Sequence, residues 1–353
     1  IVGLSVNTSY SITSFAANSI GEVNGDPLEI TTTNSIVLKS PGSLASLFDI
    51  NKPFGLEKIS IAGDMNGDDF RFLRLMLGAP LAVGAQSPLS TIPEVDLAGV
   101  NIISGGGSFD GQRYLQDNVI STGLFADCKA LKTIVLPASA ISFERDAIAR
   151  CNALTSLTVP AAVQKLLPSA GCSSLESIDV SPANTASLDG VLFNSDVTEI
   201  LWFPLGKTGE YVLPATVAVI GENAFYGTSI TSLNIPPSVV KISRGAFAGS
   251  SLVDIILPDN LTNISEAMFQ NCNSLTTVHL GRGTEFVGNY AFDGTGLKDL
   301  YLSASIPPYT NSEAFYNRAF SLFKECTLHV PASSKAIYRN HRQWGLFDNI
   351  VEL

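Results

Sequence analysis

Residues 220–236 read IGENAFYGTSITSLNIP, and residues 242–258, one period later, read ISRGAFAGSSLVDIILP. Each copy contains an Ala-Phe pair, a small residue, and then three spaced apolar residues that end at Pro. With one interruption between Val180 and Ile235, the last apolar position recurs every 21 to 23 residues, at Leu136, Val159, Val180, Ile235, Leu257, Leu280 and Leu302. A repeat of this length predicts a solenoid in which each copy forms one turn of a coil.

The end of each copy predicts a short strand. Its alternating apolar residues indicate one buried and one exposed face, and Pro ends the strand because it has no N–H to donate. One repeat cannot bury its apolar residues alone, so we expect stacked turns to share one continuous core. The residues expected to fill that core include Phe125, Phe225, Phe247, Phe269 and Phe292. The length of 353 residues agrees, since a single compact core usually stops growing at about 250–300 residues.

Three parts of the chain resemble a known family. They are Ile220–Gly227, the insert Asp189–Asn194 followed by Ile200–Pro204, and the ending Cys326–Pro331 with Trp344 and Asn349–Leu353. These residues closely resemble the BspA-like leucine-rich repeat proteins over roughly residues 120–353. The resemblance implies a leucine-rich repeat solenoid, right-handed and β-rich with short strands and few short helices. It also implies a secreted or outer-surface bacterial protein without enzymatic activity, in a family with some members described as adhesins. No binding site transfers with it, because the motif residues are the buried ones.

The periodicity also divides the chain. We expect an irregular α+β N-terminal capping region at 1–55, irregular first repeats with insertions at 56–120, the regular solenoid at 121–305, and a C-terminal capping repeat at 306–353, because the ends of a solenoid need covering. An extra hairpin at about 189–203 is expected to project from the stack.

Particular elements are expected in the irregular regions. Strands are predicted at Leu28–Thr32 and Ser35–Leu38, and a helix capped by Ser40 with Leu44, Leu47 and Phe48 facing inward. A second helix is predicted at about Asp68–Leu77, and a short one at about Ser333–Asn340.

Composition excludes several functions. The net charge of −11 and the pI near 4.7 repel phosphate backbones, so nucleic-acid binding is not expected. No segment of about 18 apolar residues predicts a membrane span. No basic signal peptide is visible, and the start at Ile1 is compatible with a mature or trimmed chain.

The cysteines and histidines predict no catalytic or metal site. Cys128, Cys151, Cys172 and Cys272 occupy the repeat position where other copies have Gly, which indicates small buried thiols, with a disulfide between neighbouring turns as the alternative. No Cys or His pair has zinc spacing. His279, His329 and His341 lie in no nucleophile motif. We therefore expect no enzyme, cofactor or metal.

Two further stretches receive structural interpretations. The run from Asp64 through Asn66 to Asp68 lacks the Gly and Glu that a calcium loop needs at its sixth and twelfth places, so it predicts a helix-capping turn. Gly105–Gly107 lacks the context of a phosphate loop and predicts an ordinary loop.

The exposed face of the strands remains as the candidate binding site. Its early rows are small and hydroxylated, whereas later rows contain residue types that anchor interfaces. The candidate residues are Trp202, Asn234, Asp254, Ile256, His279 and Tyr301. The alternative is that this face is solvated surface without a ligand.

Two functions follow from this interpretation. The first is an extracellular or outer-surface binding or adhesion module, presumed monomeric, whose partner is a host matrix protein, a bacterial surface protein or a glycan. The second is a structural scaffold or spacer of the cell envelope, with any contacts made by residues 1–120 or by the hairpin at 189–203.

Overall fold

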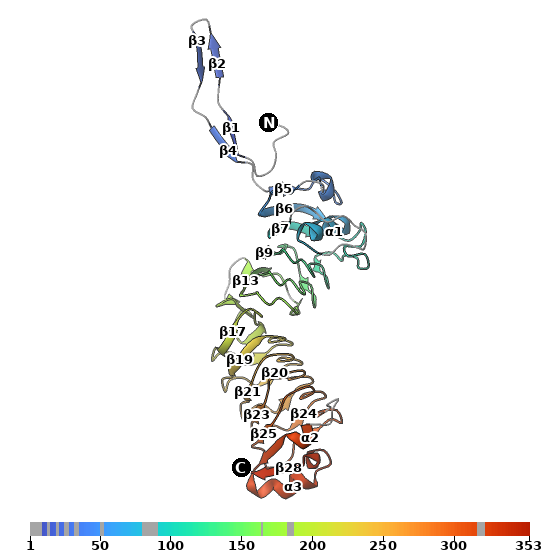
Figure 1. Ribbon diagram of the computed structural model, residues 1–353, viewed down its shortest axis with the longest axis vertical. Coiled ribbons are helices and arrows are strands. Elements are labelled where there is room, and N and C mark those ends of the chain that lie inside the picture. The colour runs from blue at the N-terminus through green and yellow to red at the C-terminus, as the bar shows by residue number, and fades with distance from the viewer. Residues whose placement is uncertain are drawn as a thin grey trace.

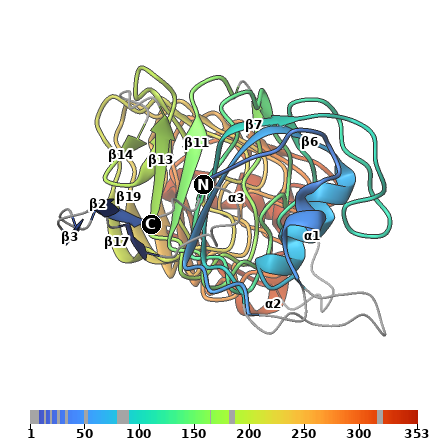
Figure 2. The same cartoon turned by 90° about the horizontal axis from the view of Figure 1, so that it is seen from above.

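A computed structural model describes residues 9–12, 15–18, 21–24, 28–31, 35–49, 53–79, 91–163, 165–181, 187–315 and 322–353. The chain forms an elongated β-solenoid that runs from the N-terminal strands at one end to the C-terminus at the other (Figure 1). Seen along the coil, α1 (Gly67–Met76) lies on the opposite side from strand β13 (Figure 2).

One column of strands, here called the main ladder, comes from the Leu-x-x-Ile-x-Leu ends of the repeats. It contains β5 (Ser35–Val37), β6 (Lys58–Met65), β7 (Glu94–Ile102), β9 (Thr133–Val135), β11 (Ser156–Pro160), β13 (Ser177–Ser181), β17 (Thr208–Val212), β19 (Ser229–Asn234), β21 (Asp254–Ile256), β23 (Thr277–Leu280), β25 (Asp299–Leu302), β27 (Thr327–Val330) and β28 (Asn349–Glu352). Its hydrogen-bonded pairs are parallel, and the predicted core positions align, since Ile134 pairs with Leu157 and Ile255 with Val278.

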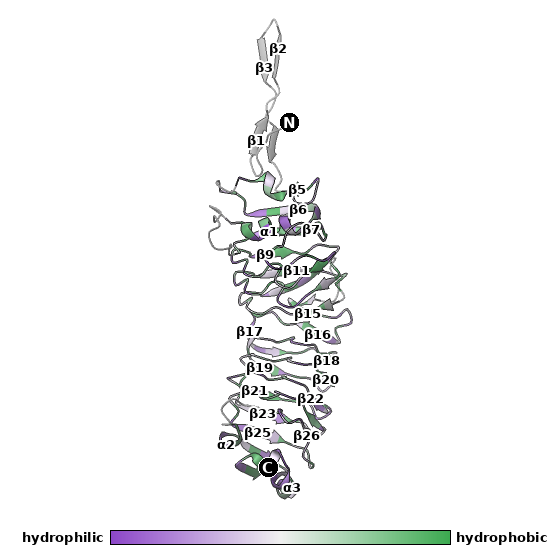
Figure 3. Ribbon diagram, turned by 90° about the vertical axis from the view of Figure 1, so that its right-hand side faces the viewer, coloured by the Kyte–Doolittle hydropathy of each residue, from purple (hydrophilic) through white to green (hydrophobic). Residues whose placement is uncertain are grey.

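A second ladder of shorter strands follows the Pro turns and stands beside the first (Figure 3). It contains β8 (Val119–Ile120), β10 (Ser142–Phe143), β12 (Lys165–Leu166), β16 (Glu199–Trp202), β18 (Val219–Ile220), β20 (Lys241–Ile242), β22 (Asn263–Ile264), β24 (Phe286–Val287) and β26 (Tyr309–Thr310). Two parallel ladders explain why each repeat needs two apolar segments.

The space between the ladders is filled by apolar side chains, as the repeat predicts. Phe203, Phe225, Phe247, Phe269, Phe292 and Phe315 form a file in which neighbouring ring centroids lie 5.0–5.8 Å apart. Phe125 and the four predicted Phe residues of this file are fully buried. We call the six stacked residues, from Phe203 to Phe315, the buried Phe file; Phe125 is not part of it.

The predicted hairpin is present but does not project. β14 (Ser187–Leu188) and β15 (Val191–Phe193) pair antiparallel, and β15 then pairs antiparallel with β16. Val191, Phe193 and Ile200 are buried. The expectation of a projecting arm is wrong, because these side chains belong to the core and β16 continues the second ladder by pairing with β18.

At the N-terminal end, β1 (Ser9–Ile12) pairs with β4 (Leu28–Thr31), and β2 (Phe15–Asn18) pairs with β3 (Gly21–Asn24). The expected cap at 1–55 falls partly outside the described residues. The helix expected after Ser40 is a single 3-10 turn, η1 (Leu44–Leu47), which begins after Ser43. Leu44 is buried, but Leu47 is exposed, contrary to expectation.

Helix α1 confirms the capping interpretation of the Asp64–Asp68 run. Asn66 accepts hydrogen bonds from the backbone N–H groups of Asp68 and Asp69, and the Asp69 side chain accepts one from the Asn66 N–H. This reciprocal capping box satisfies donors that would otherwise be unpaired at the start of the helix.

Aromatic residues close the C-terminal end. The elements there are α2 (Leu322–Glu325), η2 (Ala332–Ser334), α3 (Lys335–Asn340) and η3 (Trp344–Leu346). The rings of Phe315 and Trp344 meet edge to face at 4.8 Å. The indole N–H of Trp344 donates to the Pro308 carbonyl, which fixes the cap on the last turns.

Candidate binding face

The outward side chains of the main ladder form two files from β17 to β28. The carboxylate file contains Glu210, Ser232, Asp254, Thr277, Asp299, Thr327 and Asn349. The aromatic file, two residues further along each strand, contains Val212, Asn234, Ile256, His279, Tyr301, His329 and Val351. Five of the six candidate residues therefore lie on one continuous face.

Trp202 is the exception, and the prediction that its side chain is exposed is wrong. Its side chain is 1% exposed and packs against Phe143, with ring centroids 5.7 Å apart. It belongs to β16 in the second ladder, whereas the strand of this turn in the main ladder is β17, where Val212 is 67% exposed. The Trp202 Nε1–H has no hydrogen-bond partner, which leaves a buried donor unpaired.

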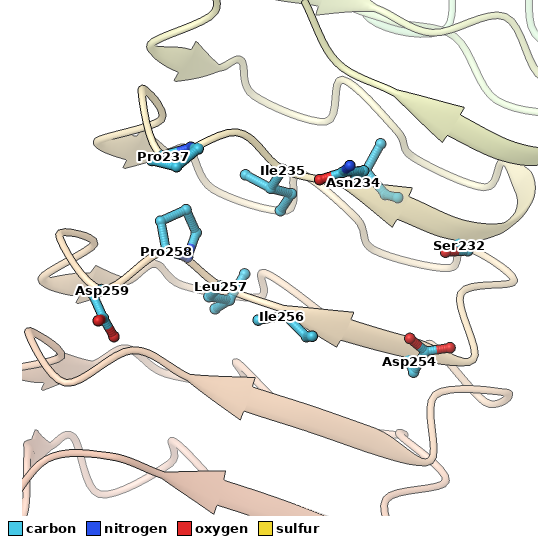
Figure 4. A pocket seen from close by; sticks show the side chains of 10 residues that line it. Ser232, Asn234, Ile235, Pro237, Asp254, Ile256, Leu257, Pro258 and Asp259 are labelled. Atoms are coloured by element: carbon cyan, nitrogen blue, oxygen red, sulfur yellow. The ribbon is translucent and has the colours of Figure 1, made fainter. Parts of the chain in front are cut away.

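A cavity of about 650 Å³ lies between β19 and β21 and contains three of the candidates. Asn234 and Ile256 face each other across the gap, Asp254 lies at one end, and Pro237 and Pro258 lie at the other (Figure 4). Asn234 and Asp254 are exposed, and Ile256 is 66% exposed.

The cavity exists because the ladders open at this junction. β19 pairs only with β17, and β21 pairs only with β23. The second ladder is interrupted at the same turn, between β20 and β22, where a cavity of about 460 Å³ lies.

The two turns remain joined along the third side of the coil. There Phe247 N–H donates to the Met268 carbonyl, and Gly249 N–H donates to the Gln270 carbonyl. We call this feature the open junction, at residues 232–243 and 254–265.

Beyond the cavity, the aromatic file becomes a stack of rings. His279 and Tyr301 lie 4.2 Å apart and nearly parallel, and Tyr301 and His329 lie 4.1 Å apart. Sequence reasoning missed His329, although its repeat position was visible. Because the rings cover one another, Tyr301 presents its edge, with the hydroxyl group, rather than its face.

The face carries negative charge without local cations. None of the seven strands from β17 to β28 contains Lys or Arg. Nearby cations are already paired, Arg282 with Asp259 at 3.1 Å and Lys298 with Glu325 at 2.8 Å. Asp254 has no hydrogen bond or ion pair with the described residues. Its carboxylate is therefore available to a partner.

The histidines modify this charge. His329 Nε2 lies 2.7 Å from Asp299 Oδ1, so this carboxylate already has a partner on the face. Burial lowers the pKa of His279 below its usual 6.5; the Asp254 carboxylate opposes this shift, and His329 adds to it. His279 is therefore neutral at pH 7.

The cysteines are structural, as predicted. The five in the sequence are free and buried. Each of Cys151, Cys172 and Cys272 donates its S–H to a backbone carbonyl of the preceding turn, at 3.0–3.1 Å. Burial raises the pKa of Cys172 to about 12, which keeps that thiol neutral and unreactive.

Within the described ranges, no three His, Cys, Asp or Glu side chains are grouped in a way that could hold a metal ion. No helix in the same part of the chain is long and apolar enough to cross a bilayer.

Solved structures similar to the chain include a leucine-rich cell surface protein from Faecalibacterium prausnitzii, with 20% identity, coverage of 91% of this chain and 79% of that one, and a TM-score of 0.47. The pneumococcal vaccine antigen PcpA has 16% identity, coverage of 84% and 79%, and a TM-score of 0.45. A leucine-rich repeat protein from Bacteroides ovatus has 17% identity, coverage of 71% and 67%, and a TM-score of 0.38.

No curated protein matches the chain. The family model described as the BspA type leucine-rich repeat region matches six copies, over residues 115–204 and 202–321. Since these ranges cover more than half of the 353 residues, the chain belongs to the BspA-type leucine-rich repeat family.

Proposed function

We propose that this protein is a non-enzymatic binding module of the bacterial cell surface, and that it attaches to a protein partner through the main-ladder face from β17 to β28. Family membership supports the surface location. Recognition depends on surface complementarity, without a chemical step.

One observation carries the proposal: the outward residues change along the coil while the buried repeat does not. Rows on β9, β11 and β13 present residues such as Thr133, Ser156 and Ser177. Rows on β21, β23 and β25 present Ile256, His279 and Tyr301 over the same Leu and Ile core. Ile256 is 66% exposed, His279 and Tyr301 are partly exposed at the edge of their stack, and aromatic residues such as Tyr are enriched among interface anchors.

Charge indicates the chemistry of the partner. Asp254 and Asp299 lie on either side of Thr277 along the carboxylate file, and β21, β23 and β25 are hydrogen-bonded rungs, so these two carboxylates are about 9.6 Å apart. Three residues of a polyproline II chain advance about 9.3 Å. A segment in this conformation with Lys or Arg at every third position therefore matches the spacing of Asp254 and Asp299.

The apolar part of the partner would lie in the cavity beside Ile256. The stacked rings supply edge hydrogen bonds next to it, from the Tyr301 hydroxyl and the His279 ring nitrogens. A sugar platform is less favoured on this face, because each ring of the stack is covered by its neighbours.

Surface plasmon resonance with the whole chain tests the proposal. The probes are matrix proteins, bacterial surface proteins and synthetic polyproline II peptides with Lys at every third or every second position. We expect binding to the three-residue spacing that weakens with salt, and at least tenfold loss in the Asp254→Asn, Asp299→Asn double variant. Asp179→Asn, an exposed change on β13, is the matched control.

Equal binding by the double variant and the control would refute the carboxylate file as the contact. Ile256→Ser is expected to weaken binding at all salt concentrations, whereas Val240→Ser, which changes an equally exposed aliphatic residue outside the face, is not.

The N-terminal part of the face presents only small or partly buried residues, and this supports a second function, that of a spacer. Thr158 on β11 is partly buried and Thr133 and Ser156 are small, so β9 and β11 offer no protruding anchor. If no probe binds the chain, the spacer function is preferred.

A further inference from the structure

A second candidate site lies where the second ladder ends. β26 is the last strand of its sheet and adjoins the C-terminal cap that contains α3 (Figure 3). A cavity of about 500 Å³ opens between them, lined by polar side chains from three separate segments. The residues that the argument uses are Asn289, Tyr309, Thr310, His341, Arg342 and Gln343. This volume is within the usual range for small-ligand pockets, about 300–1,000 Å³.

Tyr309 provides an open aromatic face at this site. One side of its ring stacks on Phe286, with centroids 5.7 Å apart and planes 19° apart. No further strand follows β26 in the ladder, and Tyr309 is 67% exposed. The negative face of an aromatic ring attracts the C–H groups of a sugar ring. Tyr309 therefore differs from Tyr301, whose two faces are covered.

The cavity also contains buried polar atoms without partners. Thr310 is 6% exposed, and its hydroxyl makes no hydrogen bond; the side-chain carbonyl of Asn289 is likewise unpaired. Buried polar groups are nearly always hydrogen-bonded, and leaving them unpaired costs free energy.

One cationic side chain, Arg342, and the polar side chains of His341 and Gln343 also line this cavity. Arg342 is exposed and forms no ion pair within the described part of this acidic chain. His341 Nδ1 accepts the backbone N–H groups of Gln343 and Trp344 at 3.3 and 3.4 Å, so a neutral ring carries its proton on Nε2 as a donor. Gln343 is held by a 2.9 Å hydrogen bond from its Nε2 to the Asn311 carbonyl.

The geometry points to a binding site for an acidic saccharide, with the sugar ring on Tyr309 and a carboxylate held by Arg342. The chemical class is a glycan that contains hexuronate units. Thr310, Asn289, His341 and Gln343 line the cavity around the ring. The site is independent of the main-ladder face and does not depend on the function proposed for that face.

Isothermal titration calorimetry tests the site with the whole chain, using a hexuronate oligosaccharide and a neutral oligosaccharide of equal length. We expect the acidic ligand to bind at least tenfold more tightly. Tyr309→Ala is expected to abolish binding of both, while Arg342→Gln removes the preference for the acid. The matched controls are Tyr226→Ala and Arg244→Gln, which change exposed residues elsewhere on the coil. Circular dichroism establishes that each variant is folded.

Three results would overturn the inference. The first is that neither oligosaccharide binds. The second is that Tyr309→Ala binds as tightly as the control. The third is that acetate or inorganic sulfate binds as tightly as the oligosaccharide, which would reduce the site to an anion site. The Asp254→Asn, Asp299→Asn variant must retain saccharide binding, which separates this test from that of the main-ladder face.

Discussion

The buried Phe file and the exposed aromatic file arise from the same repeat but obey different constraints. Inside, ring centroids are 5.0–5.8 Å apart, and each ring is held on all sides by core residues. Outside, the rings of His279, Tyr301 and His329 are 4.1–4.2 Å apart, remain partly exposed, and stack on each other, with His329 also in contact with Asp299. The comparison teaches that the buried file determines the fold, whereas the outer file is free to serve recognition.

Trp202→Ala gives the largest effect in this comparison, because Trp202 is buried although its repeat position suggests exposure. We expect the free energy of unfolding to fall by about 3–5 kcal/mol, as is typical of deleting a buried Trp. Denaturant titration measures this change. A loss below about 1 kcal/mol would be typical of a surface substitution and would restore Trp202 to the exposed face.

Phe247→Leu sharpens the comparison within the core. The substitution keeps an apolar side chain but removes ring contacts with Phe225 and Phe269, each worth about 0.5–1.5 kcal/mol. We expect a loss of about 1–3 kcal/mol in the same titration. The control is Tyr226→Leu, which changes an exposed ring. If both variants lower the free energy of unfolding equally, the ring stacking in the buried Phe file contributes nothing to stability.

Tyr301→Ala probes the outer file. We expect the free energy of unfolding to fall by only about 0.5–1 kcal/mol, because both stacked neighbours remain partly exposed to water. Binding to a protein partner should fall much more than stability does. A stability loss as large as that of Trp202→Ala would mean that the outer rings are structural.

The smallest effect is a pH dependence at His279. Its pKa is lower in the folded chain than its usual 6.5, so the folded state binds this proton less tightly than the unfolded state. This contribution to stability is complete above pH 6.5 and is lost as the pH falls through the folded-state value.

Thermal unfolding midpoints at pH 7.5, 6.5 and 5.5 measure the dependence. His279→Gln should flatten the decline below pH 6.5. A constant difference between the two midpoints at every pH would contradict this assignment. Asp254 and His329 face the same ring and are unchanged in the variant.

The repeat predicts the main ladder because its signal is carried by core residues. The pairing of Ile134 with Leu157 follows directly from their positions in successive copies. The capping turn at Asn66 and the buried thiols also follow from local chemistry and from the size required at a repeated position.

Trp202 was misplaced because Ile200, Leu201 and Trp202 imitate the end of a repeat. An insertion shifts this segment into the second ladder, where Ile200 pairs with Ile220, and only tertiary pairing reveals the shift. The cavity beside Ile256 was equally hidden, since the sequence around it is a regular repeat and the opening depends on how two turns meet. The site at Tyr309 combines residues of the last turns with residues of the C-terminal cap. The repeat spacing relates no residue of one set to a residue of the other.

The open junction has a mechanical consequence. Tension along the coil axis loads every contact between turns in series, and the contact with the fewest hydrogen bonds yields first. The Val253 N–H still bonds to the Thr231 carbonyl, but β19 does not pair with β21 and β20 does not pair with β22, so more of the load falls on the side of Phe247 and Met268. Under such tension the cavity beside Ile256 would widen, and the turn between β13 and β17, where the main ladder is also unpaired, would share the strain.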